Sequence, residues 1–190
     1  MKISTVMLAR LATLLALALI VEMVGLPQPL TGPLVNMFLF LAVSLLNMKA
    51  AILVGLFTPL VALWRGQLPA ILAPMIPFII GGNSLLILVY GSLCLYFKRK
   101  FTRKITGLTM IYEFIPVTLA ALGKFIFLFF AARFIVPLMF GKTFPEQILW
   151  MMAFPQFITA FIGGILALTV VKFLIRIGMT AQCPGNTNAE

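Results

Sequence analysis

Histidine is absent from this 190-residue sequence, which also has only two cysteines and four acidic residues. Without histidine, the imidazole ligands of many zinc sites and the commonest general base are missing. Cys94 lies in an apolar stretch and Cys183 near the C-terminus, a spacing that suits neither a metal site nor a disulfide framework. No glycine-rich loop ending in Lys-Ser or Lys-Thr is present for ATP binding. We therefore expect no metal, no cofactor and no catalytic residues, and the chain is not predicted to be an enzyme.

Charged residues are scarce as well, at 9% of the chain, whereas hydrophobic residues make up 63% and the mean hydropathy is +1.17. Soluble domains carry roughly a quarter charged residues, so this composition indicates a protein whose solvent is the lipid bilayer. The net charge is +10, but the cations lie at the ends of apolar stretches rather than in one basic patch. They therefore predict membrane orientation and not a nucleic-acid partner.

Six apolar stretches can be read as transmembrane helices: 6–24, 30–46, 50–64, 78–97, 114–139 and 147–175. The third is short, since fifteen residues rise only about 22 Å, and Pro59 predicts a bend in it. The sequence therefore predicts an all-α integral membrane protein, with a single six-helix domain over residues 1–177. Residues 178–190 are polar and are expected to form a disordered tail.

Short cytoplasmic loops of membrane proteins are enriched in lysine and arginine, which predicts the orientation of the six helices. With both termini in the cytoplasm, only Arg65 and Lys142 fall in outer loops, while Lys124 and Arg133 fall inside the fifth helix. The other ten cations are then cytoplasmic: Lys2, Arg10, Lys49, Lys98, Arg99, Lys100, Arg103, Lys104, Lys172 and Arg176. This distribution favours an even number of helices and predicts a multi-pass protein of the bacterial cytoplasmic membrane.

The two cations inside the fifth helix are the strongest candidates for function, because a charge at membrane depth costs about 2.5–3.5 kcal/mol on insertion scales. Lys124 either meets a ligand or pairs internally with Glu113 or a backbone carbonyl. Arg133 either meets a ligand or extends toward the outer headgroups. They are nine residues apart, so a straight helix points them in opposite directions and at most one is expected to contact a solute directly.

Uncharged polar residues within apolar stretches are the next candidates. Asn83 follows two glycines, and Asn36 and Gln156 lie in the second and sixth helices. Each either contacts a ligand or forms a hydrogen bond between helices. Together with Arg65, Lys124 and Arg133 they form the predicted binding set. Glu22, at the outer end of the first helix, is expected to lie in water or to pair with Arg65 or Arg133.

Small residues recur every three or four positions along the first helix, at Ala9, Ala12 and Ala16. Such spacing places them on one helix face and lets a neighbouring helix approach closely in a bilayer. The partner helix could belong to this chain or to another protein.

The stretches TGPLVNMFLFLAV, GLFTPLVALWRGQLP and APMIPFIIGGN resemble the substrate-binding S components of energy-coupling factor (ECF) vitamin importers, in a subgroup of unassigned substrate. The resemblance implies that Ala12 and Ala16 contact a transmembrane coupling subunit, which works with two ATPase subunits. It also implies a vitamin-like micronutrient, polar or anionic, bound toward the outer face beneath residues 22–31 and 64–77. The alternative is a small anchor or assembly subunit of a larger redox or biosynthetic complex, without a ligand of its own.

Overall fold

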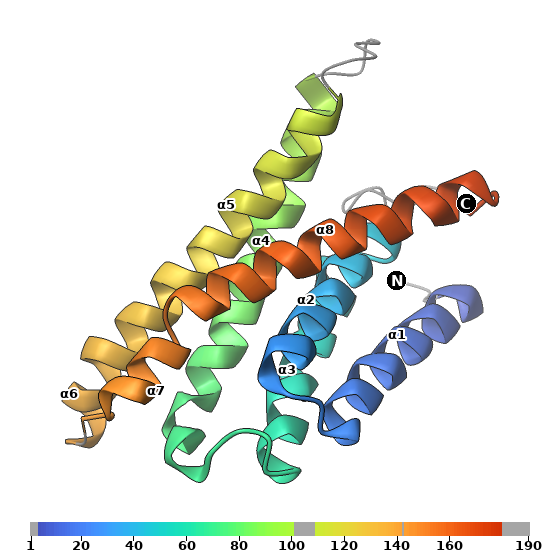
Figure 1. The fold of residues 1–190 in the computed structure, drawn as a ribbon. Coiled ribbons are helices and arrows are strands. Elements are labelled where there is room, and N and C mark those ends of the chain that lie inside the picture. The colour runs from blue at the N-terminus through green and yellow to red at the C-terminus, as the bar shows by residue number, and fades with distance from the viewer. Residues whose placement is uncertain (1–3, 101–108, 142, 180–190) are drawn as a thin grey trace.

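The computed structural model describes residues 4–100, 109–141 and 143–179, without the side chains of residues 99, 100 and 109–112. Lys2, Arg103, Lys104, Lys142 and Cys183 lie outside these residues, as does the predicted tail from residue 180 onward. Within the described ranges the secondary structure is entirely helical (Figure 1). The elements are α1 (Thr5–Val24), α2 (Gln28–Leu45), α3 (Met48–Trp64), η1 (Ala70–Met75), α4 (Ile76–Lys100), α5 (Thr109–Phe130), η2 (Ala131–Ile135), α6 (Val136–Phe140), α7 (Glu146–Met151) and α8 (Phe154–Arg176).

Five helical segments are long and apolar enough to cross a membrane, which confirms the prediction of an all-α membrane protein. They are Thr5–Val24, Gln28–Leu45, Ala70–Lys98, Glu113–Phe140 and Glu146–Arg176. The sixth predicted span, α3, has 17 residues and a rise of about 25 Å at 1.5 Å per residue. It begins at Met48 and so includes Lys49, which is exposed, while the side chain of Asn47 caps its first turn.

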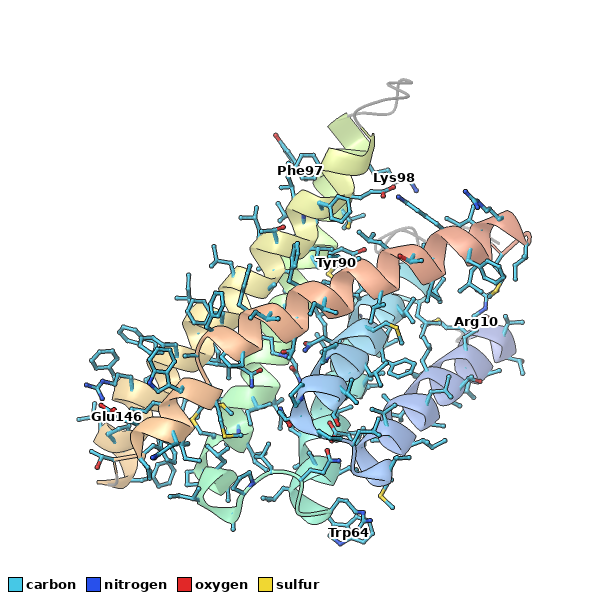
Figure 2. The ribbon with its side chains drawn as sticks, in the orientation of Figure 1. Arg10, Trp64, Tyr90, Phe97, Lys98 and Glu146 are labelled. Atoms are coloured by element: carbon cyan, nitrogen blue, oxygen red, sulfur yellow. The ribbon has the colours of Figure 1, made fainter. Side chains whose placement is uncertain are left out.

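Successive long segments run in opposite directions, so the two chain ends lie at the same end of the molecule (Figure 1). The α2–α3 turn and the C-terminal end of α4 lie toward this end as well (Figure 1). Arg10 and Lys98 lie toward the same end, whereas Trp64 and Glu146 lie at the opposite one (Figure 2). Two of the cations that are predicted to be cytoplasmic, Arg10 and Lys98, thus share one end of the molecule (Figure 2).

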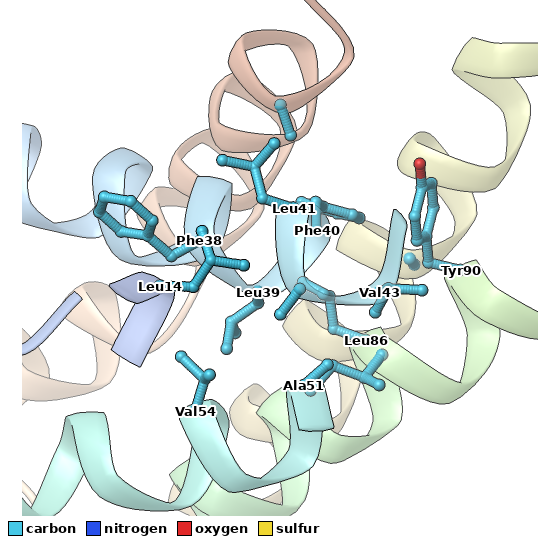
Figure 3. Packing of buried hydrophobic residues seen from close by; sticks show 14 of the residues in the cluster. Leu14, Phe38, Leu39, Phe40, Leu41, Val43, Ala51, Val54, Leu86 and Tyr90 are labelled. Carbon is cyan, nitrogen blue, oxygen red and sulfur yellow. The ribbon is translucent and has the colours of Figure 1, made fainter. Parts of the chain in front are cut away.

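Helix α2 is the centre of the fold, since it packs against α1, α3, α4 and α8. Its residues 38–43 form an unbroken buried apolar run in contact with all these neighbours. Figure 3 shows Leu14 of α1, Val54 of α3 and Leu86 of α4 around it. The ring of Tyr90 meets Phe40 edge-on at 4.7 Å between centroids, and its hydroxyl lies 3.2 Å from the hydroxyl of Ser44. A helix that is apolar on all sides is thus buried on all sides.

The predicted sixth helix over 147–175 falls within one candidate span, Glu146–Arg176. This span is divided in two, because the chain breaks at Met152 and Ala153 between α7 and α8. Pro155 explains the break, since it has no N–H to donate to the carbonyl of Met151. The side chain of Gln156 donates to that carbonyl instead, with 3.3 Å between Nε2 and the oxygen. The predicted loop before the fourth helix is also partly helical, since residues 70–75 form η1.

The predicted fifth helix over 114–139 is continuous but contains a π-helical segment at η2. Pro137, just beyond it, cannot donate to the carbonyl of Arg133, and a widened turn is one way for a helix to adapt to such a loss. The fifth helix therefore departs from a straight α-helix near Arg133.

Gly163 allows α8 to lie directly on α2. A Cβ at this position would approach the carbonyl oxygen of Pro33 to 2.5 Å and the Cβ of Asn36 to 2.8 Å. We expect Gly163→Ala to destabilise the protein by about 1–3 kcal/mol, because the obstacle is backbone and cannot rotate away. The preference of helices for alanine over glycine, roughly 1 kcal/mol, offsets only part of the cost of this clash.

Thermal unfolding of the purified protein in detergent would measure this change. Gly123→Ala is the matched control, since the nearest atom to its Cβ is 4.0 Å away, on Leu85. A melting temperature for Gly163→Ala equal to that of Gly123→Ala would contradict the close-packing argument.

Candidate binding cavity

Three helices each contribute one side chain to a buried polar cluster. The ammonium of Lys124 on α5 donates to Oδ1 of Asn36 on α2 and to Oδ1 of Asn83 on α4, both at 2.7 Å. The three side chains are only 3–4% exposed. Hydrogen bonds to a charged group are stronger than neutral ones, and they partly offset the cost of burying an ammonium ion.

The backbone fixes the orientation of both asparagine amides. Nδ2 of Asn36 donates to the carbonyl of Gly32 at 2.8 Å, and Nδ2 of Asn83 donates to the carbonyl of Gly55 at 3.0 Å. Each Oδ1 is therefore directed to Lys124. Gly55 makes the second bond possible, since a Cβ there would lie 3.1 Å from the Cβ of Asn83. The cluster is consequently preorganised to hold its positive charge in one place.

Lys124 faces an internal cavity of about 70 Å³. Apart from Tyr90, the described residues include six polar or charged side chains that are buried, and all six line this cavity: Glu22, Thr31, Asn36, Thr58, Asn83 and Lys124. They come from α1 to α5, and Gln156 of α8 completes the wall. In an otherwise apolar bundle, the buried polar groups are thus concentrated at a single site.

Glu22 is buried at 6% exposure, so the expectation that it lies in water or pairs with Arg65 or Arg133 is wrong. It lies on the inward stripe of α1 with Leu14 and Ala18. The Gln67 side-chain amide is oriented so that its oxygen faces donors and its nitrogen faces an acceptor. In this orientation Nε2 donates to Oε2 of Glu22 at 3.0 Å, and the amide oxygen accepts from the N–H groups of residues 25 and 26. Glu22 is therefore part of the cavity wall.

Two larger hollows adjoin this cavity, each of about 440 Å³. The first lies among the loops at the end opposite the termini and shares Gln28 and Gln67 with the cavity. The second is an apolar groove between α2 and α8, and it shares Gln28 and Gln156. Gln28 thus lies where all three meet, between the deep polar cavity and the two wider spaces.

Four of the six predicted binding residues come together at this cavity, namely Asn36, Asn83, Lys124 and Gln156. Arg65 lies in the adjoining hollow, where its Nε donates to the carbonyl of Met23 at 3.1 Å. Arg133 is exposed and lines a separate hollow with Glu146 and Trp150.

The alternative partner predicted for Lys124 is also wrong. Glu113 forms an ion pair with Lys172 of α8 instead. Lys124 and Arg133 thus point into different spaces.

Several polar members of the wall were not among the predicted binding residues: Glu22, Gln28, Thr31, Thr58 and Gln67. Thr58 and Gln67 are single polar residues beside a proline or in a loop, positions at which polar residues are common. Glu22 was noticed but assigned to solvent, because its place at a helix end gives no sign of which way it points. The spacing of Leu14, Ala18 and Glu22 at intervals of four is the signal that could have placed it on the buried face.

Comparisons of the chain with protein-family models, with curated proteins and with solved structures returned no match. The function is therefore inferred from the geometry of the cavity and from the sequence resemblance.

Proposed function

We propose that this chain is the substrate-binding S component of an ECF-type importer in a bacterial cytoplasmic membrane. It would span the membrane six times, capture a small vitamin-like solute on the outer face and release it inward with a coupling subunit and two ATPases. The observation that carries the proposal is the concentration of buried polar side chains around one cavity. Ionisable groups within membrane spans usually mark a solute or ion pathway.

The position of the cavity supports the same proposal. It lies toward the end of the bundle opposite the termini, next to the α1–α2 and α3–η1 loops. With cytoplasmic termini, this end faces outward. Gln28, Gln67 and Leu68 come from the two segments that the family resemblance implies above the ligand. The cavity would then receive its solute from outside the cell.

Two linked measurements test the proposal. The chain would be co-expressed with a coupling subunit and the ATPase pair, purified through a tag on the chain, and examined by native mass spectrometry for a retained small molecule. We expect a four-subunit assembly, with the solute bound to the chain alone. A chain that neither retains a solute nor binds the ATPase module would contradict the proposal.

A membrane anchor or assembly subunit is the second candidate. The observation that favours it is that Lys124 already has two partners, so the cluster could serve only to hold α2, α4 and α5 together. Such a protein needs no solute. It would co-purify from its native membrane with other subunits. Native mass spectrometry would detect no retained small molecule, even in freshly isolated protein.

A further inference from the structure

The cavity wall holds an acidic and a basic side chain that do not pair with each other. Glu22 and Lys124 are 6% and 4% exposed and line the same space. Neither of them forms an ion pair with another residue that the structure describes, since Glu113 pairs with Lys172. Buried charges in proteins are generally paired, because an isolated one loses its hydration without compensation. A bound solute could supply the partner that each of these two groups lacks.

Both groups retain free hydrogen-bonding capacity. The ammonium of Lys124 has three N–H donors, of which two are used by Asn36 and Asn83. The carboxylate of Glu22 receives one hydrogen bond, from Gln67, and its second oxygen has no donor among the described residues. The hydroxyl of Thr58, also in the wall, has no partner in the described part of the chain. The cavity thus offers an anion site and a cation site together.

We propose that the solute is a small zwitterion whose carboxylate binds Lys124 and whose ammonium group binds Glu22. This inference rests on the proposed function and specifies its substrate class. A simple anion would satisfy Lys124 but leave Glu22 unpaired and repelled. A simple cation would pair with Glu22 but leave Lys124 unpaired and repelled. A neutral solute would displace water from both groups without giving either an opposite charge. Among charged solutes, a zwitterion is the class that supplies an opposite charge to both sites at once.

The dimensions limit which part of the solute enters. At about 70 Å³ the deep cavity has room for a few water molecules or for the short segment of a solute that carries its carboxylate and its ammonium group. A vitamin-sized ligand needs a pocket of roughly 300–1,000 Å³. The charged end of the solute would therefore occupy the deep cavity. Any larger remainder would extend past Gln28 into the adjoining hollow that Arg65 lines.

The test uses the full chain in detergent and a series of linear amino acids: glycine, β-alanine, γ-aminobutyrate and δ-aminovalerate. Each is matched with its carboxamide, which lacks the negative charge, and its N-acetyl derivative, which lacks the positive charge. Calorimetry and melting temperature report binding. We expect at least one zwitterion to bind about tenfold or more tightly than both of its derivatives, the order of one lost charged hydrogen bond.

Two variants assign the charges. Glu22→Gln should lose the preference for the zwitterion over its N-acetyl derivative, and Lys124→Gln the preference over its carboxamide. Arg133→Gln is the control, since Arg133 lies outside the cavity, and it should keep both preferences. The comparison of derivatives on the unmodified chain gives a result even if a variant does not fold.

Equal binding of a zwitterion and either derivative, or no binding across the series, would overturn the zwitterion proposal. Retention of a singly charged or neutral solute in the mass spectrum would also overturn it, while leaving the importer proposal intact. The importer proposal fails separately, through the absence of both solute and ATPase module.

Discussion

Replacing Lys124 by methionine is expected to lower the occupancy of the bound solute by about tenfold to a hundredfold. Methionine keeps the length and the apolar stem of the side chain but removes the ammonium group. A hydrogen bond to a charged group contributes about 1.5–3 kcal/mol, and each 1.4 kcal/mol is a factor of ten in affinity. Native mass spectrometry of the variant, with the molecule retained by the unmodified chain as reference, would measure the loss.

The same substitution should change stability much less than binding. It leaves the Oδ1 atoms of Asn36 and Asn83 without their donor, which costs about 1–3 kcal/mol for each oxygen that stays dry. Water in the adjoining cavity can reach these oxygens and reduce that cost. The variant also no longer buries an ammonium ion, which is a gain. Because these effects oppose each other, we expect a melting temperature close to that of the unmodified protein.

Arg133→Met is the matched control for Lys124→Met. It removes a cation from the same helical segment, yet Arg133 is exposed and borders a different hollow. Its solute occupancy should stay at the unmodified level. If Lys124→Met retains the solute at the unmodified level, Lys124 does not contribute to solute binding. A large fall in its melting temperature would favour the purely structural function of the cluster.

The sequence was sufficient for the apolar helices and for most of the polar cluster, for one physical reason. A bilayer makes a polar or charged residue inside a span costly, so Asn36, Asn83 and Lys124 had to have partners or a function. That three separate helices bring the amide oxygens of both asparagines to 2.7 Å from the ammonium of Lys124 is a consequence of tertiary packing. No local pattern contains this information, and the internal alternative for Lys124, a pair with Glu113 or a backbone carbonyl, accordingly named neither asparagine.

Helix ends were the weakest part of the prediction. Glu22 lies at the last turn of α1, where a carboxylate can face either water or protein, and only the packing of α1 on α2 and α3 decides between them. The break between α7 and α8 and the π-helical η2 are similar cases. Pro155 and Pro137 show that a hydrogen bond is lost. They do not show whether the helix kinks, widens or stops.

The largest effect on assembly is expected from Ala12→Leu combined with Ala16→Leu, which should reduce recovery of the coupling subunit and ATPases about tenfold or more. Both alanines are exposed, as is Ala9, whereas α1 buries Leu14, Ala18 and Glu22 on its other side. The small residues thus form a face that no helix of the described chain covers. Close approach of two membrane helices depends on such residues, and leucine side chains would hold a partner helix away.

The exposure of these alanines makes the experiment selective. Because the substituted side chains point away from the core, the double variant should keep its solute and its melting temperature while losing its partners. Ser92→Leu combined with Thr169→Leu is the control, since it adds leucines at exposed positions of α4 and α8. Full recovery of the ATPases with the α1 variant would exclude this face as the contact. Equal loss in both variants would mean that added bulk anywhere on the lipid-facing surface is enough to prevent assembly.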